Sequence, residues 1–543
     1  MESATIEGCQ RMSDAAGGSP SVVLEPSTAA TVISAPGTSV RREGDAPALG
    51  RPEVERTPSR PPSLVSKAWK KGGFWAVPVV VAFALSVWHI GRPGLWRDEL
   101  FTWDRSTLSL PDIVGVMHAT DSVFVPYYLF MHGWIALFGT SPVALRMPSA
   151  LAMTAAAGVV ALLGRRLFTP STGALAGLIF AFVPAVSRHG QEAKPHIFAA
   201  LFVALATLLL VRALESPRWS RWVPYAAACT LVGFSHLLAF IMIIAHGVAV
   251  VALEWRRNRR AVAKWAIAAT VAALPVSVLA AAGYAHRGPV AWLPLTTWQA
   301  MFDYPVRLTS GSIFNLRGAG VLAGLVLTLG FLAVLGNGRA SWLLGTLALV
   351  PPAVLMLAGE FEHIYHPRYL LYTLVAWAVL AAATLVALRP ALAIPLVVAI
   401  VLLGIPTQLV NRQSNGHGDD GVSTVAAILA GESRSGDGIM FQISAGDWFA
   451  IGTKYYSARV GDPAGNVSLR RLAHTAAECD SRQCPVDTPR VWVACLGRHT
   501  DALECLTPEQ QAAVRRVYAA TPVRVHRDPR FTLAVFQLGS PPS

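Results

Sequence analysis

Residues 196–213 read HIFAALFVALATLLLVRA, a run with a single arginine and no acidic residue. A helix needs about 20 mostly apolar residues to cross the hydrocarbon core of a bilayer. Similar runs recur along the chain, so the sequence predicts a polytopic α-helical membrane protein with about 11 transmembrane helices. The predicted segments are 74–91, 146–164, 173–187, 196–213, 222–236, 237–253, 265–284, 319–336, 341–358, 369–388 and 391–406.

The composition excludes a purely soluble enzyme. Of the 543 residues, 53% are hydrophobic and only 14% are charged, whereas soluble domains are about 25% charged. The formal net charge is +13, but many of the basic residues lie in short connections between apolar runs. That placement is typical of membrane orientation, and no stripe of alternating basic and aromatic residues predicts nucleic-acid binding.

The loop charges predict which side each loop faces. The connections assigned to the cytoplasm, together with the three lysines before the first run, hold 15 basic residues and two acids. Because positively charged loops stay in the cytoplasm, we expect a cytoplasmic N-terminus and an extracytoplasmic C-terminus in the cell membrane. The basic residues are Lys67, Lys70, Lys71, Arg165, Arg166, Arg212, Arg218, Arg221, Arg256, Arg257, Arg259, Arg260, Lys264, Arg339 and Arg389.

Three regions are predicted. Residues 1–66 contain no aromatic residue and are rich in Ser, Thr, Pro, Gly and Ala, which favours a disordered cytoplasmic tail. Residues 67–406 form the transmembrane domain. Residues 407–543 form an extracytoplasmic soluble domain, and its alternating short helical and strand patterns predict a small α/β fold.

Four cysteines fall in the predicted outer domain: Cys479, Cys484, Cys495 and Cys505. In an oxidising compartment such a set is best explained by two disulfides, most simply between sequence neighbours. A zinc site is the alternative, but the spacing lacks the close C-x-x-C pairs that zinc sites usually have.

Ionisable residues gather at the predicted outer ends of the spans. The first outer loop begins GLWRDEL at residues 94–100, with the carboxylates Asp98 and Glu99 side by side. Charged groups near the hydrocarbon boundary are costly and tend to be functional, although an interface-anchoring turn is the plainer interpretation. Residues 126–138 are too few to span the bilayer and are aromatic and amphipathic, which predicts an interfacial or re-entrant helix.

Two further outer loops supply cations. Residues 188–196 read RHGQEAKPH and residues 360–369 read EFEHIYHPRY, while the fourth outer loop carries Trp292. A carboxylate can take the proton of an acceptor hydroxyl, and cations can stabilise a departing phosphate. Sugar transfer from a lipid phosphate needs a carboxylate and cations on the same side of the membrane, and the sequence places both at the outer ends of the spans.

Five motifs occur in a fixed order: WRDE at 96–99, YY at 127–128 through FG at 138–139, LRMPSA at 145–150, QEAKP at 191–195 and PRY at 367–369. Together they resemble the bacterial relatives of the dolichyl-phosphate-mannose–protein mannosyltransferases, family 39 of the GT-C glycosyltransferases. The resemblance covers about residues 74–406. The sequence departs from the family pattern at two points. VFVP at 123–126 stands before the tyrosines, where the family often has a His-Pro-Pro stretch. Lys194 stands where the family commonly has arginine, which keeps the positive charge but loses the planar guanidinium group.

The resemblance implies a GT-C fold, an external active site and a polyprenyl-phosphate sugar donor, with mannose as the sugar it suggests. It implies that Asp98 is the catalytic carboxylate. The expected reaction transfers the sugar to an acceptor hydroxyl and inverts the configuration at the anomeric carbon. Glu99 is the second candidate catalytic residue. The acceptor is an unidentified glycan, lipid or protein. The candidate substrate-binding residues are Arg97, Tyr127, Tyr128, Gln191, Glu192, Lys194, His366, Arg368 and Tyr369.

No cofactor is predicted. Asp98 and Glu99 could hold a divalent cation, but two adjacent carboxylates without further acidic ligands are weak evidence for a metal site. Two other functions remain open at this point. A glycolipid transporter or flippase should place charges at mid-membrane depth and often has an internal repeat; the sequence has no such repeat, and its charges lie at span ends. A non-catalytic scaffold for the outer domain would leave the Asp98–Glu99 and Gln191–Lys194 clusters without a role.

Overall fold

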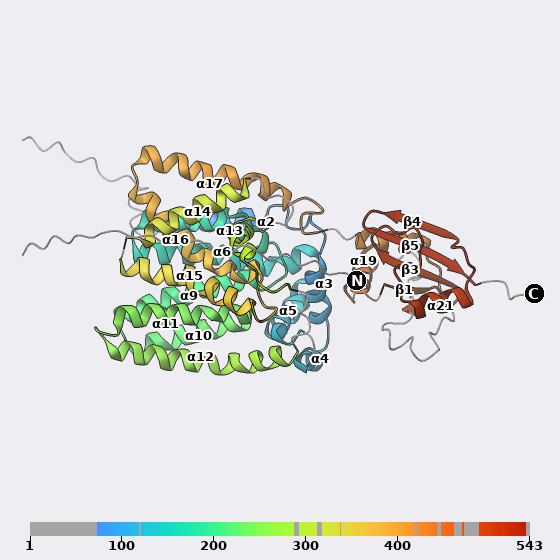
Figure 1. The fold of residues 1–543 in the computed structure, drawn as a ribbon, viewed down its shortest axis with the longest axis horizontal. Coiled ribbons are helices and arrows are strands. Elements are labelled where there is room, and N and C mark those ends of the chain that lie inside the picture. Colours follow the sequence, from blue (N-terminus) through green and yellow to red (C-terminus); the bar gives the residue numbers. More distant parts are fainter. Residues whose placement is uncertain are drawn as a thin grey trace, which may run out of the picture. The chain divides into compact units, whose positions relative to one another are not determined.

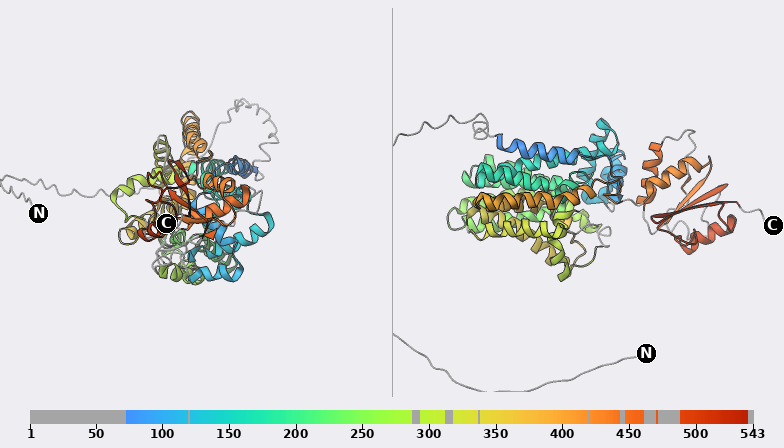
Figure 2. Two further views of the ribbon diagram at one scale, coloured as in Figure 1. Left: turned by 90° about the vertical axis from the view of Figure 1, so that its right-hand side faces the viewer. Right: turned by 90° about the horizontal axis from the view of Figure 1, so that it is seen from above.

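The computed structural model describes residues 73–118, 121–286, 293–311, 318–336, 338–418, 421–442, 447–460, 470–471 and 488–538. The predicted tail at 1–66 lies outside these residues, as do Trp292, Cys479 and Cys484. In the described part of the chain, long helices run alongside one another as a bundle (Figures 1 and 2).

Every one of the predicted apolar segments is helical. The corresponding helices are α2 (Ala76–Val87), α6 (Pro142–Leu167), α7 (Pro170–Phe182), α9 (His196–Glu215), α10 (Trp219–Ser235), α11 (Met242–Glu254), α12 (Arg259–Ala285), α14 (Ala319–Val334), α15 (Arg339–Gly359), α16 (Leu374–Ala387) and α17 (Pro390–Val410). Within the described ranges, seven helices are long and apolar enough to span a membrane alone, when the preceding 3-10 turns are joined to α11 and α16. The chain is therefore a multi-span membrane protein, and the number of crossings stays a prediction.

Small residues let these helices approach closely. Where α6 meets α7, a β-carbon on Gly173 would lie 2.3 Å from the carbonyl oxygen of Ala161, and one on Gly164 would lie 2.9 Å from the α-carbon of Gly173. Alanines fill much of the remaining core. Such close backbone contact is the usual basis of helix association in membranes, where the hydrophobic effect gives no preference for helix over lipid.

Along the sequence, shorter helices connect the long ones. They are α3 (Arg97–Ser106), α4 (Leu110–Gly115), α5 (Val125–Phe138), α8 (Pro184–His189), α13 (Trp298–Ser310) and the 3-10 helix η6 (Pro367–Thr373). Helix α5 confirms that residues 126–138 are helical, and the place of this helix relative to the membrane stays a prediction. Helix α3 starts with Asp98 and Glu99 in its first turn, where the partial positive charge of the helix end favours carboxylates.

The C-terminal region contains a five-stranded sheet in the order β2-β1-β3-β5-β4. Strand β1 is parallel to β2 and β3, while β5 is antiparallel to β3 and β4. The elements are α18 (Val422–Glu432), β1 (Gly438–Phe441), α19 (Trp448–Val460), β2 (Arg470–Arg471), β3 (Arg490–Leu496), α21 (Pro508–Val517), β4 (Arg524–Asp528) and β5 (Phe531–Gln537).

Both faces of this sheet are covered. Side chains alternate along the strands, so Trp492 and Leu533 pack with α18 and α19 on one face. Val493 and Phe536 pack with Val514 of α21 on the other. A disulfide joins Cys495 of β3 to Cys505, whose α-carbons are 5.8 Å apart.

Candidate active site

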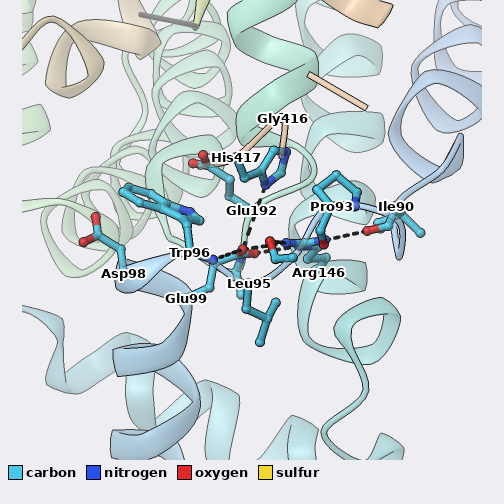
Figure 3. A network of polar contacts seen from close by, with 12 residues as sticks. Ile90, Pro93, Leu95, Trp96, Asp98, Glu99, Arg146, Glu192, Gly416 and His417 are labelled. Atoms are coloured by element: carbon cyan, nitrogen blue, oxygen red, sulfur yellow. Dashed lines mark hydrogen bonds and ion pairs between the residues drawn. The ribbon is translucent and has the colours of Figure 1, made fainter. Parts of the chain in front are cut away.

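A buried arginine organises the turn that precedes α3. Arg146 of α6 is fully buried, and all five of its N–H groups donate. Two go to Glu99, from Nε to Oε1 at 2.7 Å and from Nη2 to Oε2 at 2.6 Å. The other three go to the carbonyl oxygens of Ile90, Pro93 and Gly94 at 2.8, 2.8 and 2.9 Å. The guanidinium fork suits such planar recognition, and Figure 3 shows the network.

The Glu99 carboxylate also accepts hydrogen bonds from backbone N–H groups. Besides Arg146, it accepts the N–H of Ala193 at 2.9 Å and the N–H of Trp96 at 3.4 Å. Burial by itself would raise the pKa of Glu99, but the charge and hydrogen bonds of Arg146 outweigh it and lower the pKa to about 2. Glu99 therefore stays ionised and fastens α3 to α6 and to the loop before α9.

Asp98 faces a different partner. Its side chain is 21% exposed, and its Oδ2 accepts a hydrogen bond from Nη1 of Arg368 at 3.1 Å. Figure 3 shows its carboxylate directed away from Glu99. The guanidinium of Arg368 also lies 5.7 Å from the centre of the Trp96 ring. Two predicted site residues that are 270 positions apart are thus in direct contact.

One cation contacts this carboxylate, and a second lies in the loop before α9. The Nε of Arg368 is buried and has no hydrogen-bond partner among the described residues, which is unusual for a buried donor and indicates a place for an acceptor atom. Lys194 is 6% exposed, and its Nζ lies 4.8 Å from the centre of the Phe124 ring. Within the described part of the chain, no carboxylate is recorded within ion-pair distance of this ammonium group.

The loop before α9 is built from buried polar residues. Gln191 is fully buried and donates from Nε2 to the carbonyl oxygens of Ser86 at 2.8 Å and Trp88 at 2.7 Å. Glu192 is also buried, 3.0 Å from Nε of Arg188 and 2.7 Å from Nδ1 of His189. Burial by itself would raise the pKa of Glu192, but these two neighbours hold it well below its usual range. These contacts of Gln191 and Glu192 fix the loop that carries Lys194.

Aromatic residues complete the surroundings. Tyr127 and Tyr128 are buried, and the hydroxyl of Tyr128 has no hydrogen-bond partner in the described ranges. Tyr369 lies next to Arg368, with its ring centre 5.5 Å from that of His366. Burial, with help from Arg368, lowers the pKa of His366 to about 3, so its ring is neutral. Arg97 is exposed and takes no part in these contacts.

Several residues of the site were not among the predicted ones. Arg146 was noted only as part of a motif, although it is the main partner of Glu99. His196 and His236 pack around Tyr369, with ring centres 6.1 and 4.8 Å from it. His417, in the segment after α17, lies with Nδ1 3.9 Å from Oε2 of Glu99. Two of them carried a sequence signal: Arg146 is a basic residue at the start of an apolar run, and His196 ends the polar segment RHGQEAKPH.

No metal site is apparent in the described residues, where no three His, Cys, Asp or Glu side chains come together in a way that could hold an ion. The partly exposed carboxylate of Asp98 contacts Arg368, and Lys194 is a second buried cation. A carboxylate can accept a proton, and cations can stabilise a developing phosphate charge.

The chain is similar to known glycosyltransferases. Residues 124–281 match the family model described as dolichyl-phosphate-mannose-protein mannosyltransferase. The structure of ArnT from Cupriavidus metallidurans in the apo state has a TM-score of 0.57 and 13% identity, over 87% of this chain and 98% of that one. The structure of ArnT from Cupriavidus metallidurans bound to undecaprenyl phosphate has a TM-score of 0.54 and 14% identity, over 86% and 98%.

None of the curated protein sequences compared with the chain matches it. At identities this low, the structural likeness establishes the fold, and the family model adds an independent match to part of the membrane domain. The resemblance drawn from the five motifs is therefore confirmed: the chain has the fold of the GT-C glycosyltransferases and, over residues 124–281, the sequence pattern of the dolichyl-phosphate-mannose-protein mannosyltransferase family.

Proposed function

We propose that this protein transfers a sugar from a polyprenyl-phosphate donor to an acceptor hydroxyl, with inversion at the anomeric carbon. The contact between Asp98 and Arg368 carries the proposal, because it brings a base next to a cation that can bind phosphate. The ArnT structure with bound undecaprenyl phosphate supports a lipid-phosphate donor for this fold.

The proposed reaction is a single displacement. The acceptor oxygen attacks the anomeric carbon as its proton passes to Asp98, and the bond from that carbon to the phosphate oxygen breaks. The electron pair leaves with the lipid phosphate, whose charge Arg368 and Lys194 stabilise. One base acting opposite the leaving group inverts the anomeric centre. The neutral His366 and the Tyr128 hydroxyl can form hydrogen bonds to the substrates without adding charge.

Glu99 has a supporting role in this scheme. Its oxygens accept N–H groups of Arg146, Trp96 and Ala193, and its side chain is fully buried. An acceptor hydroxyl cannot reach it without breaking that network. We therefore assign Glu99 to positioning and Asp98 to catalysis, while Gln191 and Glu192 hold the loop that presents Lys194.

The sugar that the family name suggests is mannose, and the acceptor class is open. The direct test is to incubate membranes containing the protein with a panel of labelled polyprenyl-phosphate sugars and to follow which label moves. Release of label that depends on Asp98 would support the proposal. Movement of intact lipid-linked sugar across the bilayer, without bond cleavage, would instead indicate a flippase.

Replacing Arg368 with alanine should weaken donor use about 10- to 100-fold, since a hydrogen bond to a charged group contributes about 1.5–3 kcal/mol. The measurement is kcat/KM for the donor in purified protein. The control is Arg515→Ala, because Arg515 of α21 is an exposed arginine that pairs with Asp501 and should leave donor kinetics unchanged. Equal donor kinetics in both variants would remove Arg368 from the site.

We further propose that the N-terminus is cytoplasmic and that the region after about residue 406 is extracytoplasmic, as the loop charges predict. Reporter fusions at residues 60 and 415 test this. A cytoplasmic reporter should be active only at the first position and an extracytoplasmic reporter only at the second. Both ends on one side would contradict the orientation and the external active site with it.

A further inference from the structure

The turn that carries Asp98 is held from two directions. Its carbonyl groups accept the donors of Arg146, as described above. Its N–H groups point elsewhere: Gly94 donates to the carbonyl oxygen of Ser414 at 3.0 Å, and Leu95 donates to the hydroxyl of Tyr456 at 2.7 Å. Ser414 follows α17, and Tyr456 belongs to α19 of the C-terminal region. The turn is therefore completed by a part of the chain more than 300 positions away.

Helix α19 also packs along α3 itself. The rings of Trp103 and Tyr455 meet edge to face, with centres 5.0 Å apart. Nζ of Lys454 lies 3.8 Å from Oδ1 of Asp104. Leu100 and Ile451 are members of one buried cluster. Aromatic and apolar contacts of this kind resist sliding of one helix on the other, so the position of α3 depends on α19.

The sequence at the turn fits this contact. A β-carbon on residue 94 would lie 3.3 Å from the Tyr456 hydroxyl, so glycine gives that hydroxyl room to reach the Leu95 N–H. The segment after α17 adds further contacts, because Nη1 of Arg188 donates to the carbonyl oxygen of Gly416 at 2.6 Å. His417 next to it is buried beside Glu99.

We propose that the C-terminal α/β domain is part of the catalytic arrangement and that Tyr456 is a positioning residue for Asp98. This inference rests on the proposed function. Leu95 precedes Asp98 by three residues, so a shift of the turn moves the base directly. A displacement of about 1 Å in a reacting group can cost about 100-fold in rate. Tyr456 acts only through the backbone, and it need not contact either substrate.

The experiment compares two neighbouring tyrosines on the same helix. Tyr456→Phe removes the acceptor of the Leu95 N–H, whereas Tyr455→Phe removes a hydrogen bond to the carbonyl oxygen of Thr140. Each variant loses one tyrosine hydroxyl from α19, so any general loss of stability of the domain should be equal in the two variants. We expect Tyr456→Phe to lower kcat about tenfold, with donor KM within about twofold of the original protein. Tyr455→Phe should keep kcat.

Thermal unfolding of both variants is measured in parallel, together with Asp98→Asn. Equal kcat losses in the two tyrosine variants, or a Tyr456→Phe defect confined to KM or to the unfolding temperature, would overturn the positioning role. If Asp98→Asn abolishes transfer in that case, only the inference about Tyr456 fails. If Asp98→Asn retains transfer, the catalytic assignment of Asp98 fails, and if the original protein transfers no sugar from any donor, the proposed function itself fails, whatever the tyrosine variants do.

Discussion

Asp98→Asn should fold and bind donor normally while its turnover falls about 100- to 10,000-fold, the usual cost of losing a general base. Asparagine is nearly the same size as aspartate and can still accept a hydrogen bond from Arg368, so the local structure should persist. It cannot take the acceptor's proton. The measurement is kcat of purified protein at saturating donor, with binding of polyprenyl phosphate measured separately.

The matched control for this variant is Asp528→Asn. The side chain of Asp528, in β4, is also partly exposed, at 31%, and also pairs with an arginine, because its Oδ1 lies 2.7 Å from Nε of Arg530. It takes no part in the contacts of α3 described above, so its loss should leave turnover within about twofold of the original value. Near-normal turnover in Asp98→Asn, or an equal defect in Asp528→Asn, would refute the catalytic assignment of Asp98.

Arg146→Met should destabilise the protein by about 3–5 kcal/mol, because it leaves the buried Glu99 carboxylate without its cation. It also leaves the carbonyl groups of Ile90, Pro93 and Gly94 without donors. The shift in the unfolding equilibrium of purified protein in detergent measures this effect. Transfer activity should fall as well, since the turn before Asp98 loses its support.

The control is Arg166→Met, which breaks a pair with Glu215 whose partners are 48% and 39% exposed. Exposed pairs contribute about 0–1 kcal/mol, so this variant should unfold almost like the original protein. The double variant Arg146→Met, Glu99→Met should recover only part of the loss, because the backbone carbonyls remain unpaired. An Arg146→Met protein as stable as Arg166→Met would show that the buried pair contributes little.

Much of the membrane domain could be predicted from the sequence. Apolar runs long enough to span a bilayer have few alternatives to a helix, because lipid offers no hydrogen bonds to the backbone. Loop charge then grouped the candidate residues on one side, and Asp98 and Arg368 are indeed in contact. The contact itself could not be predicted, because the sequence around a carboxylate does not determine which of several distant cations it will pair with.

The difference between Asp98 and Glu99 also required the structure. Consecutive residues on a helix project about 100° apart, so two neighbouring carboxylates can have opposite surroundings. The positions of α6 and η6 show that Glu99 faces Arg146 while Asp98 faces Arg368. Arg146 was not selected as a site residue because the apolar run that follows it in the sequence gives no sign of its partners, all of which lie within residues 90–99. Helix α19 lacked a clear periodic pattern and was not predicted.

The donor pattern of Arg146 has an evolutionary consequence. Three of its five N–H groups serve backbone carbonyls, and no substitution elsewhere can remove those acceptors. Lysine has only three donors on a point charge and no planar fork, so it cannot replace the guanidinium. The acid at position 99, by contrast, is required chiefly because Arg146 is there. Selection on the two positions should therefore be coupled: in relatives, an arginine at residue 146 should be accompanied by an acid at residue 99, and a change at 146 should occur together with a different loop.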